Sequence, residues 1–220
     1  LKSPIAQHET YRNMLHHPEI LQIVSQLIGY GLRCNGNKLN MKQPGYGSPV
    51  EWHQDWSFYP HTNDDLLAVG IAIDDMTEEN GPLLVIPGSH KGPIYDHHYE
   101  GNFCGAVTDS AFSDKAAVPV MVKAGGITLH HVRMLHGSVA NTSSKPRRLL
   151  LFQYCAIDAW PLSGVSDYGA FNASIVQGEP SNIPRVEPVP VRMPLPPPVK
   201  SGSIYESQTV LQKSTFGRRS

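Results

Sequence analysis

Short apolar segments separated by turns constrain the fold of this chain more than any other feature. Turn-forming residues at 63–65, 80–82 and 125–126 interrupt the apolar pattern. Few helices accompany these segments and no strand–helix alternation is visible, which favours an antiparallel sandwich, barrel or jelly roll. The strand candidates are 37–43, 50–56, 66–74, 83–86, 118–122, 126–132 and 147–157.

One helix is predicted before the strands, over residues 18–29. Pro18 suits a first helical turn and Gly29 suits the end of a helix. The spacing of the apolar residues between them predicts one buried face, and we expect this helix to pack on a sheet. The residues of that face are Ile20, Ile23, Val24, Leu27 and Ile28.

The composition changes at Ile183, where the run PRVEPVPVRMPLPPPVK begins. Proline at this density forms neither an interior strand nor a helix. We therefore predict a single domain over 1–182, with its core at about 35–160, and an extended proline-rich tail over 183–220. The tail is expected to wrap the domain or to reach a neighbouring subunit, which would make the protein a homo-oligomer.

The net charge narrows the classes of partner, and the cysteine content bears on the cellular location. Lys and Arg total 18 against 19 Asp and Glu, a net charge of -1, which argues against nucleic acid and anionic lipid as partners. No apolar run reaches the length of a membrane span. The three cysteines form no CxxC pair, so a cytoplasmic location is expected. The 11 histidines direct attention to a metal site.

The stretch EWHQDWSFYP, residues 51–60, holds the first candidate ligands. On a strand, His53 and Asp55 would point to the same face, about 7 Å apart at their Cα atoms. The pattern is weak alone, because 17–19 and 98–100 have the same His-x-acid form. Those two copies lack further partners at informative spacing, and we expect them to lie on the solvated surface.

A second group of polar residues follows downstream, at His136, Ser138 and Arg147. The turn-rich segment 141–146 lets the chain reverse, which predicts Arg147 on the strand adjacent to that of His136. Two histidines and one carboxylate make the facial triad of non-haem Fe(II) oxygenases. A fixed guanidinium nearby would hold a dicarboxylate through two hydrogen bonds.

Three stretches carry a family resemblance: HQD with its following aromatics, NGPLLVIPGSH at 80–90, and LHGS followed by RR. Over about residues 35–160 the chain resembles the phytanoyl-CoA dioxygenase family. The resemblance implies a mainly β fold, a double-stranded β-helix (jelly roll, cupin-like) with flanking helices. It also implies hydroxylation of a small organic molecule at an unactivated C–H bond with Fe(II), 2-oxoglutarate and O₂, releasing succinate and CO₂.

The resemblance assigns roles to single residues. His53, Asp55 and His136 would be the catalytic iron ligands, and the presence of Asp55 implies hydroxylation rather than halogenation. Arg147 would hold the distal carboxylate of 2-oxoglutarate with help from Ser138. Two further cosubstrate contacts are expected on the inward face of strand 37–43, at Lys38 and Asn40.

The substrate side is assigned to four residues: Gln54, Trp56, Phe58 and His131. His131 competes with His136 as third ligand, and we prefer for it a contact with substrate or with a ligand. His130 is then expected to point the opposite way, and Arg148 to be a surface charge. Two alternatives stay open: a cupin-like metal enzyme that does not use 2-oxoglutarate, and a non-catalytic binding module on the same fold.

Overall fold

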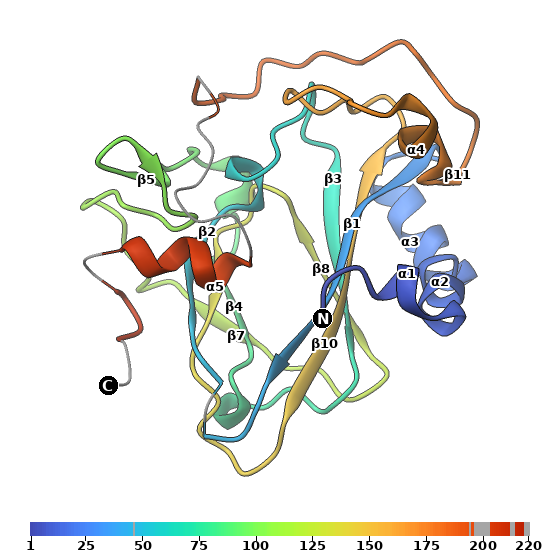
Figure 1. The fold of residues 1–220 in the computed structure, drawn as a ribbon. Helices are drawn as coiled ribbons and strands as arrows, with labels where there is room; N and C mark the ends of the chain where they lie inside the picture. The colour runs from blue at the N-terminus through green and yellow to red at the C-terminus, as the bar shows by residue number, and fades with distance from the viewer. Residues whose placement is uncertain (46, 194, 196–202, 212–213, 218–220) are drawn as a thin grey trace.

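The computed structural model describes residues 1–45, 47–193, 195, 203–211 and 214–217. Two curled antiparallel sheets face each other (Figure 1). The first has the order β11-β1-β10-β3-β8, and its strands are β1 Leu32–Lys42, β3 Leu66–Ala72, β8 Ile127–His131, β10 Arg147–Ala156 and β11 Ile175–Gln177. The second has the order β2-β9-β4-β7, and its strands are β2 Val50–His53, β4 Leu83–Val85, β7 Val118–Val120 and β9 His136–Ser138.

Shorter elements connect and cover the sheets. A two-stranded hairpin consists of β5 His98–Tyr99 and β6 Asn102–Phe103. The remaining helices are α1 Pro4–Gln7, α2 Glu9–Leu15, α3 Pro18–Ile28, α4 Tyr168–Ala173 and α5 Ile204–Ser207, with 3-10 turns η1 Asp55–Ser57, η2 Glu78–Asn80, η3 Ser89–Lys91 and η4 Gln208–Val210. No helix in the described part of the chain is long and apolar enough to cross a membrane.

The N-terminal helices cover the outer face of the five-stranded sheet (Figure 1). Helix α3 has the predicted bounds, beginning at Pro18 and ending before Gly29. Its buried face is narrower than predicted, because Ile23 and Leu27 are 39% and 58% exposed. The helix contacts the sheet along one stripe only, so the outer residues of the apolar pattern stay in solvent.

Strand β10 divides the interior into a helix side and a cavity side. Successive side chains on a strand point to opposite faces. Leu150, Phe152 and Tyr154 therefore point outward and pack in the core beneath the N-terminal helices. Arg147 and Leu149 have the opposite parity and point between the two sheets. There Leu149 packs in a second cluster of buried apolar side chains.

Small residues on β3 keep the space between the sheets open. Ala68 and Gly70 lie on the inward face of this strand, and Gly70 pairs with Thr128 of β8. A Cβ atom at Gly70 would lie 2.6 Å from Thr128 Oγ1 and 3.1 Å from Leu149 Cδ1. Because Gly70 has no side chain, β8 and β10 pack closely around it without filling the interior.

The C-terminal segment packs on its own domain where the structure describes it. Arg185 forms ion pairs with Asp65 and Asp158, and the carbonyl of Pro190 accepts a hydrogen bond from the indole of Trp56 at 2.9 Å. The expectation of a wholly extended tail is wrong, because α5 and η4 are helical turns. The densest proline run, at 196–198, lies outside the described residues.

Gln208 anchors the end of this segment to β2. Its amide oxygen accepts a hydrogen bond from the backbone of Glu51 at 3.0 Å, and its amide nitrogen donates to the carbonyl of Gly105 at 2.9 Å. The carboxylate of Glu51 in turn accepts from the backbone nitrogen of Thr215 at 2.8 Å and from the hydroxyl of Ser214. Both side chains are buried, so water does not compete for these bonds.

We predict that Gln208→Ala loosens the C-terminal segment. The substitution leaves the buried N–H of Glu51 without its partner, which costs roughly 1–3 kcal/mol. Limited proteolysis followed by mass spectrometry should show faster cleavage after residue 203 than in the wild type. Thr209→Ala, at an exposed position of the same turn, is the control. Equal cleavage rates for Gln208→Ala and the control would contradict the anchoring role.

Candidate active site

Pairing of β2 with β9 brings the two candidate histidine ligands together. His53 and His136 are partners in the antiparallel register, and their ring centroids lie 4.0 Å apart. The Nδ1 atom of each ring lies close to a backbone carbonyl, that of Glu51 at 2.8 Å and that of Met134 at 2.9 Å. Since Nδ1 then carries the proton, each Nε2 presents a lone pair to the space between the rings.

Asp55 completes this group from a turn rather than from a strand. Strand β2 ends at His53, and Asp55 opens the 3-10 turn η1, so the predicted strand geometry of the HQD motif is wrong. Asp55 Oδ1 nevertheless lies 3.8 Å from Nε2 of His53 and 3.9 Å from Nε2 of His136. The three donor atoms lie within 4.8 Å of one another, and all three residues are buried.

Burial and charge set these groups in the protonation states that a cation requires. Burial lowers the pKa of His53 to about 4 and that of His136 well below its usual value. Burial alone would raise the pKa of Asp55, but the ring of His130, followed by His136, Lys38 and His53, holds it well below its usual value. Neutral imidazoles and an ionised carboxylate are the forms that bind a metal.

Arg147 reaches the same space from the opposite sheet. It begins β10, which pairs with β1 and β3, so its predicted place on the strand next to His136 is wrong. The guanidinium is 3% exposed and donates through Nε and Nη2 to the carbonyl of Gly81, at 3.2 and 3.0 Å. These two bonds hold the guanidinium in one orientation.

A small chamber of about 50 Å³ contains this group. His53, Asp55, His136 and Arg147 all line it. The predicted cosubstrate contacts line it as well, namely Lys38, Asn40 and Ser138. Strands β1, β2, β9 and β10 thus direct one cluster of metal-binding and cationic side chains into a single space.

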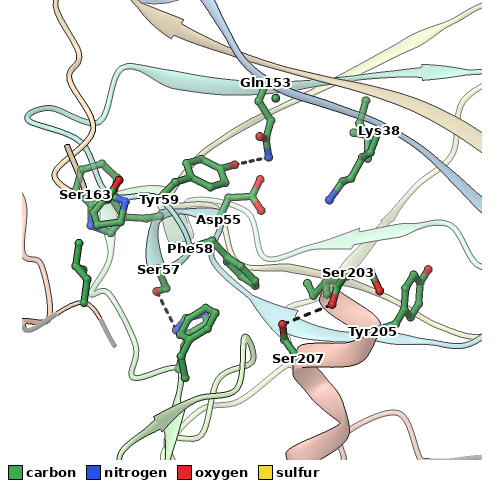
Figure 2. A pocket seen from close by; sticks show the side chains of 18 of the residues that line it. Lys38, Asp55, Ser57, Phe58, Tyr59, Gln153, Ser163, Ser203, Tyr205 and Ser207 are labelled. Atoms are coloured by element: carbon green, nitrogen blue, oxygen red, sulfur yellow. Dashed lines mark hydrogen bonds between the residues drawn. The ribbon is translucent and has the colours of Figure 1, made fainter. Parts of the chain in front are cut away.

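The chamber borders a cavity of about 1150 Å³, and Asp55, Lys38 and Gln153 line both. Figure 2 shows the Asp55 carboxylate with Lys38 approaching from β1, and residues of α5 on the far side of the space. Beside Asp55, the amide of Gln153 donates to the hydroxyl of Tyr59 at 2.6 Å (Figure 2). Helix α5 therefore supplies part of the wall of the large cavity.

Two predicted substrate contacts lie elsewhere. Gln54 is fully buried, and its amide binds the carbonyls of Pro93 and Arg133 at 3.0 and 2.9 Å. It joins two loops and lines neither cavity. His131 also lines neither cavity, and its ring lies 5.7 Å from that of His90.

The predicted orientations of His130 and His131 are wrong. His130 points inward, with its ring centroid 4.4 Å from that of His136. The prediction placed His131 toward the cavity because it lies five residues before His136, but an odd separation on alternating strand positions puts two side chains on opposite faces. Counting six residues back from His136, an even separation, would instead have placed His130 inward, where the structure has it.

The aromatic residues of the motif divide between packing and cavity wall. Trp56 is 1% exposed and packs in the core with Leu66 and Val132, while one side of it borders the large cavity. Phe58 borders the same cavity and sets its ring against His53, with centroids 5.8 Å apart. Both residues thus lie beside the candidate site, and their contact with a substrate stays a prediction.

The sequence also predicted surface positions for Arg148, for 17–19 and for 98–100. Arg148 is a surface charge, as predicted, and pairs with Asp74 at 2.6 Å. Glu19 is exposed, in accordance with the surface prediction for 17–19. His98 is different, because its side chain is 7% exposed, pairs with Asp96 at 2.7 Å and borders the large cavity. The surface prediction for His98 is therefore wrong.

The donor set fits a ferrous ion and a dicarboxylate. Two nitrogen ligands and one carboxylate on one side of an ion leave positions for a cosubstrate and O₂. Bonds of about 2.1 Å allow two ligands of one ion to lie at most about 4.2 Å apart, which the two distances from Asp55 Oδ1 satisfy. The buried guanidinium of Arg147 in the same chamber supplies the charge that a distal carboxylate needs.

Comparison with known proteins gives the same assignment. The sequence profile of the family described as Phytanoyl-CoA dioxygenase (PhyH) matches residues 2–149. A probable alpha-ketoglutarate-dependent hypophosphite dioxygenase of Stutzerimonas stutzeri is 39% identical, covering 98% of this chain and 77% of the relative. The L-proline trans-4-hydroxylase of Streptomyces griseoviridis is 30% identical, covering 70% of this chain and 65% of the relative.

A solved structure shares the fold. The non-haem alpha-ketoglutarate-dependent carbocyclase from nogalamycin biosynthesis is 30% identical and has a TM-score of 0.60, covering 78% of this chain and 68% of that one. The predicted mainly β, jelly-roll architecture is thereby confirmed.

Fold and site together define a non-haem iron dioxygenase that depends on 2-oxoglutarate. The chain belongs to the phytanoyl-CoA dioxygenase family.

Lys42 is a buried lysine that sequence reasoning did not assign to the site. It lies opposite Arg147 in the β1–β10 register, and its ammonium group donates to the carbonyl of Ser138 at 3.3 Å and to that of Val139. Burial, and then the charge of Arg147, lower the pKa of Lys42 to about 6. The alternation of Lys38, Asn40 and Lys42 along one face of β1 was the available signal.

We predict that Lys42 makes stability rise with pH. An unfolded lysine has a pKa of about 10.4. Between the folded pKa of about 6 and that value the unfolded state binds one proton more, so the free energy of unfolding rises by up to ~1.4 kcal/mol per pH unit. Urea unfolding of the metal-free protein from about pH 7 to 8.5 should show a steeper rise for wild type than for Lys42→Met. Lys91→Met, at an exposed position, should keep the wild-type slope, and a wild-type slope in Lys42→Met would refute the assignment.

Proposed function

We propose that this chain oxygenates a small molecule through an iron centre held by His53, Asp55 and His136, with Arg147 binding the distal carboxylate of 2-oxoglutarate. One observation carries the proposal: the three donor atoms and the Arg147 guanidinium come from opposite sheets and line one buried chamber. A non-catalytic module needs no such combination. A cupin-like enzyme without 2-oxoglutarate needs no buried arginine there.

The protein contributes binding, orientation and exclusion of water. When bound, the ferrous ion supplies the oxygen chemistry, with 2-oxoglutarate as the reductant that leaves as succinate and CO₂. The bonds from Arg147 to Gly81 fix the guanidinium before the cosubstrate arrives. Ser138, Asn40 and the ammonium group of Lys38 supply further polar contacts in the chamber. Leu149 and Leu151 form its apolar wall and restrict water.

The large cavity supports an organic substrate. Its volume of about 1150 Å³ exceeds what a small inorganic anion needs, and its wall includes Phe58 beside the iron ligands. A second candidate is an inorganic phosphorus oxyanion, favoured by the relative that is 39% identical over 98% of the chain. Lys38 would supply a cation for such an anion. Succinate formation should be stimulated by members of one class only, in a panel of amino acids, cyclic amino-acid derivatives, acyl esters and hypophosphite.

We also propose a cellular location and retain the prediction of a homo-oligomer. A cytoplasmic location is supported by the three cysteines, Cys34, Cys104 and Cys155, which are free thiols. Contact with a second copy through the C-terminal tail stays a prediction, since the described part of that tail packs on its own chain.

We predict that His136→Ala abolishes iron binding. The loss of one of three ligands leaves the buried pair His53 and Asp55, which cannot hold the ion alone. Anaerobic Fe(II) titration should show stoichiometric binding in the wild type and none in the variant, and succinate formation should cease. His16→Ala, which removes an exposed histidine, is the control. Full turnover by His136→Ala would remove this residue from the iron centre.

We predict that Arg147→Ala raises the KM for 2-oxoglutarate by roughly 10- to 100-fold, because charge-assisted hydrogen bonds contribute about 1.5–3 kcal/mol. The titration of the visible charge-transfer band of the anaerobic Fe(II) protein with 2-oxoglutarate measures the same loss directly. Arg148→Ala, at the adjacent surface position, should leave both values unchanged. An unaltered affinity in Arg147→Ala would contradict its role, and the absence of the band in wild type would favour an enzyme that does not use 2-oxoglutarate.

A further inference from the structure

His130 is a buried histidine beside the candidate iron centre with no assigned task. It lies on the inward face of β8 and is 5% exposed. Neither of its ring nitrogens has a hydrogen-bond partner within the described chain. A buried polar atom without a partner costs roughly 1–3 kcal/mol, so two such atoms in one side chain require an explanation.

The polar neighbours of His130 are already engaged with other groups. Gln153, which lies on β10 across from Ala68, donates its amide to the hydroxyl of Tyr59. Thr128, the next inward residue of β8, has its hydroxyl 3.5 Å from the carbonyl of Gly70. Ala68, the partner of His130 in the β3–β8 register, has no polar side-chain atom. The chamber side, which His130 lines, is therefore where its partner lies.

Asp55 presents its two oxygens to different histidines. Oδ1 lies 3.8 Å from His53 and 3.9 Å from His136, measured to Nε2 of each ring. Oδ2 lies 3.8 Å from Nε2 of His130. One oxygen thus faces the pair of metal-binding nitrogens, while the other faces a ring outside that pair. The 3.8 Å separation exceeds a hydrogen bond, so the contact inferred here requires the two side chains to approach each other.

We infer that His130 is a positioning residue that donates from Nε2–H to Oδ2 of Asp55, so that Asp55 binds iron through Oδ1 alone. The inference rests on the proposed function, since it takes His53, Asp55 and His136 as the iron ligands. A carboxylate held through its second oxygen cannot turn to bind with both, and one more position on the ion stays open for cosubstrate or O₂. Outer partners of this kind fix ligand orientation and raise metal affinity.

The test uses Co(II) as a spectroscopic probe in the full chain. His130→Phe removes the donor and keeps an aromatic ring, while His130→Gln retains an N–H at a similar reach. Isothermal titration should show a roughly 10- to 100-fold weaker Co(II) affinity in His130→Phe and a value close to wild type in His130→Gln. The visible Co(II) spectrum should change in the phenylalanine variant, because its intensity reports coordination number.

His131→Phe is the matched control, since that ring points to the other face of the same strand. It should leave affinity and spectrum unchanged. If circular dichroism shows that His130→Phe is unfolded, His130→Leu takes its place.

Three results would overturn the inference. Wild-type affinity in a folded His130→Phe or His130→Leu would show that His130 does not act on the metal site. An equal loss in His130→Gln would mean that the imidazole itself is required, as a ligand. An equal loss in His131→Phe would mean that disturbance of β8, rather than the donor, is responsible. Failure of the proposed function is a separate result, because wild type and His136→Ala would then bind Co(II) equally poorly.

Discussion

The antiparallel pairing of β2 with β9 is the constraint on which the site depends. It sets His53 opposite His136, and the backbone carbonyls two residues before each ring fix the tautomer that presents Nε2. Asp55, at the start of η1, directs its carboxylate toward the Nε2 atoms of both rings. A shift of one residue in this register would send one imidazole to the other face of the sheet, so the pairing itself specifies the centre.

The five-stranded sheet supplies the other half of the site by the same rule of alternation. Arg147, Leu149 and Leu151 follow one another on the inward face of β10 and line the chamber, while Leu150 points the other way and packs beneath the helices. Lys42 and Arg147 lie directly opposite each other, so two buried basic groups share one end of the interior. Burial, and then the charge of Arg147, lower the pKa of Lys42 to about 6, so that near neutral pH Arg147 is the charged member of the pair.

Sequence predicted the strands and the triad well, because hydrophobic alternation and motif spacing are local signals. It also predicted the inward row of Lys38 and Asn40, since strand parity holds within β1. It failed where the chain leaves a strand. Asp55 lies in a 3-10 turn beyond the end of β2. The error over His131 had another cause, because its odd separation from His136 already indicated the opposite face. The sheet that carries Arg147 could not be deduced either, because β10 returns to the opposite sheet rather than to the neighbouring strand.

The wall around the large cavity comes from two parts of the chain. The candidate iron ligands and Arg147 all lie within residues 2–149, the part that matches the family profile, whereas Pro190, Ile204 and Tyr205 lie beyond it. The segment that carries them is attached through Gln208, Glu51 and Trp56, none of which the chemistry uses. Side chains of this segment can therefore reshape the cavity wall without altering the groups proposed to hold iron and cosubstrate.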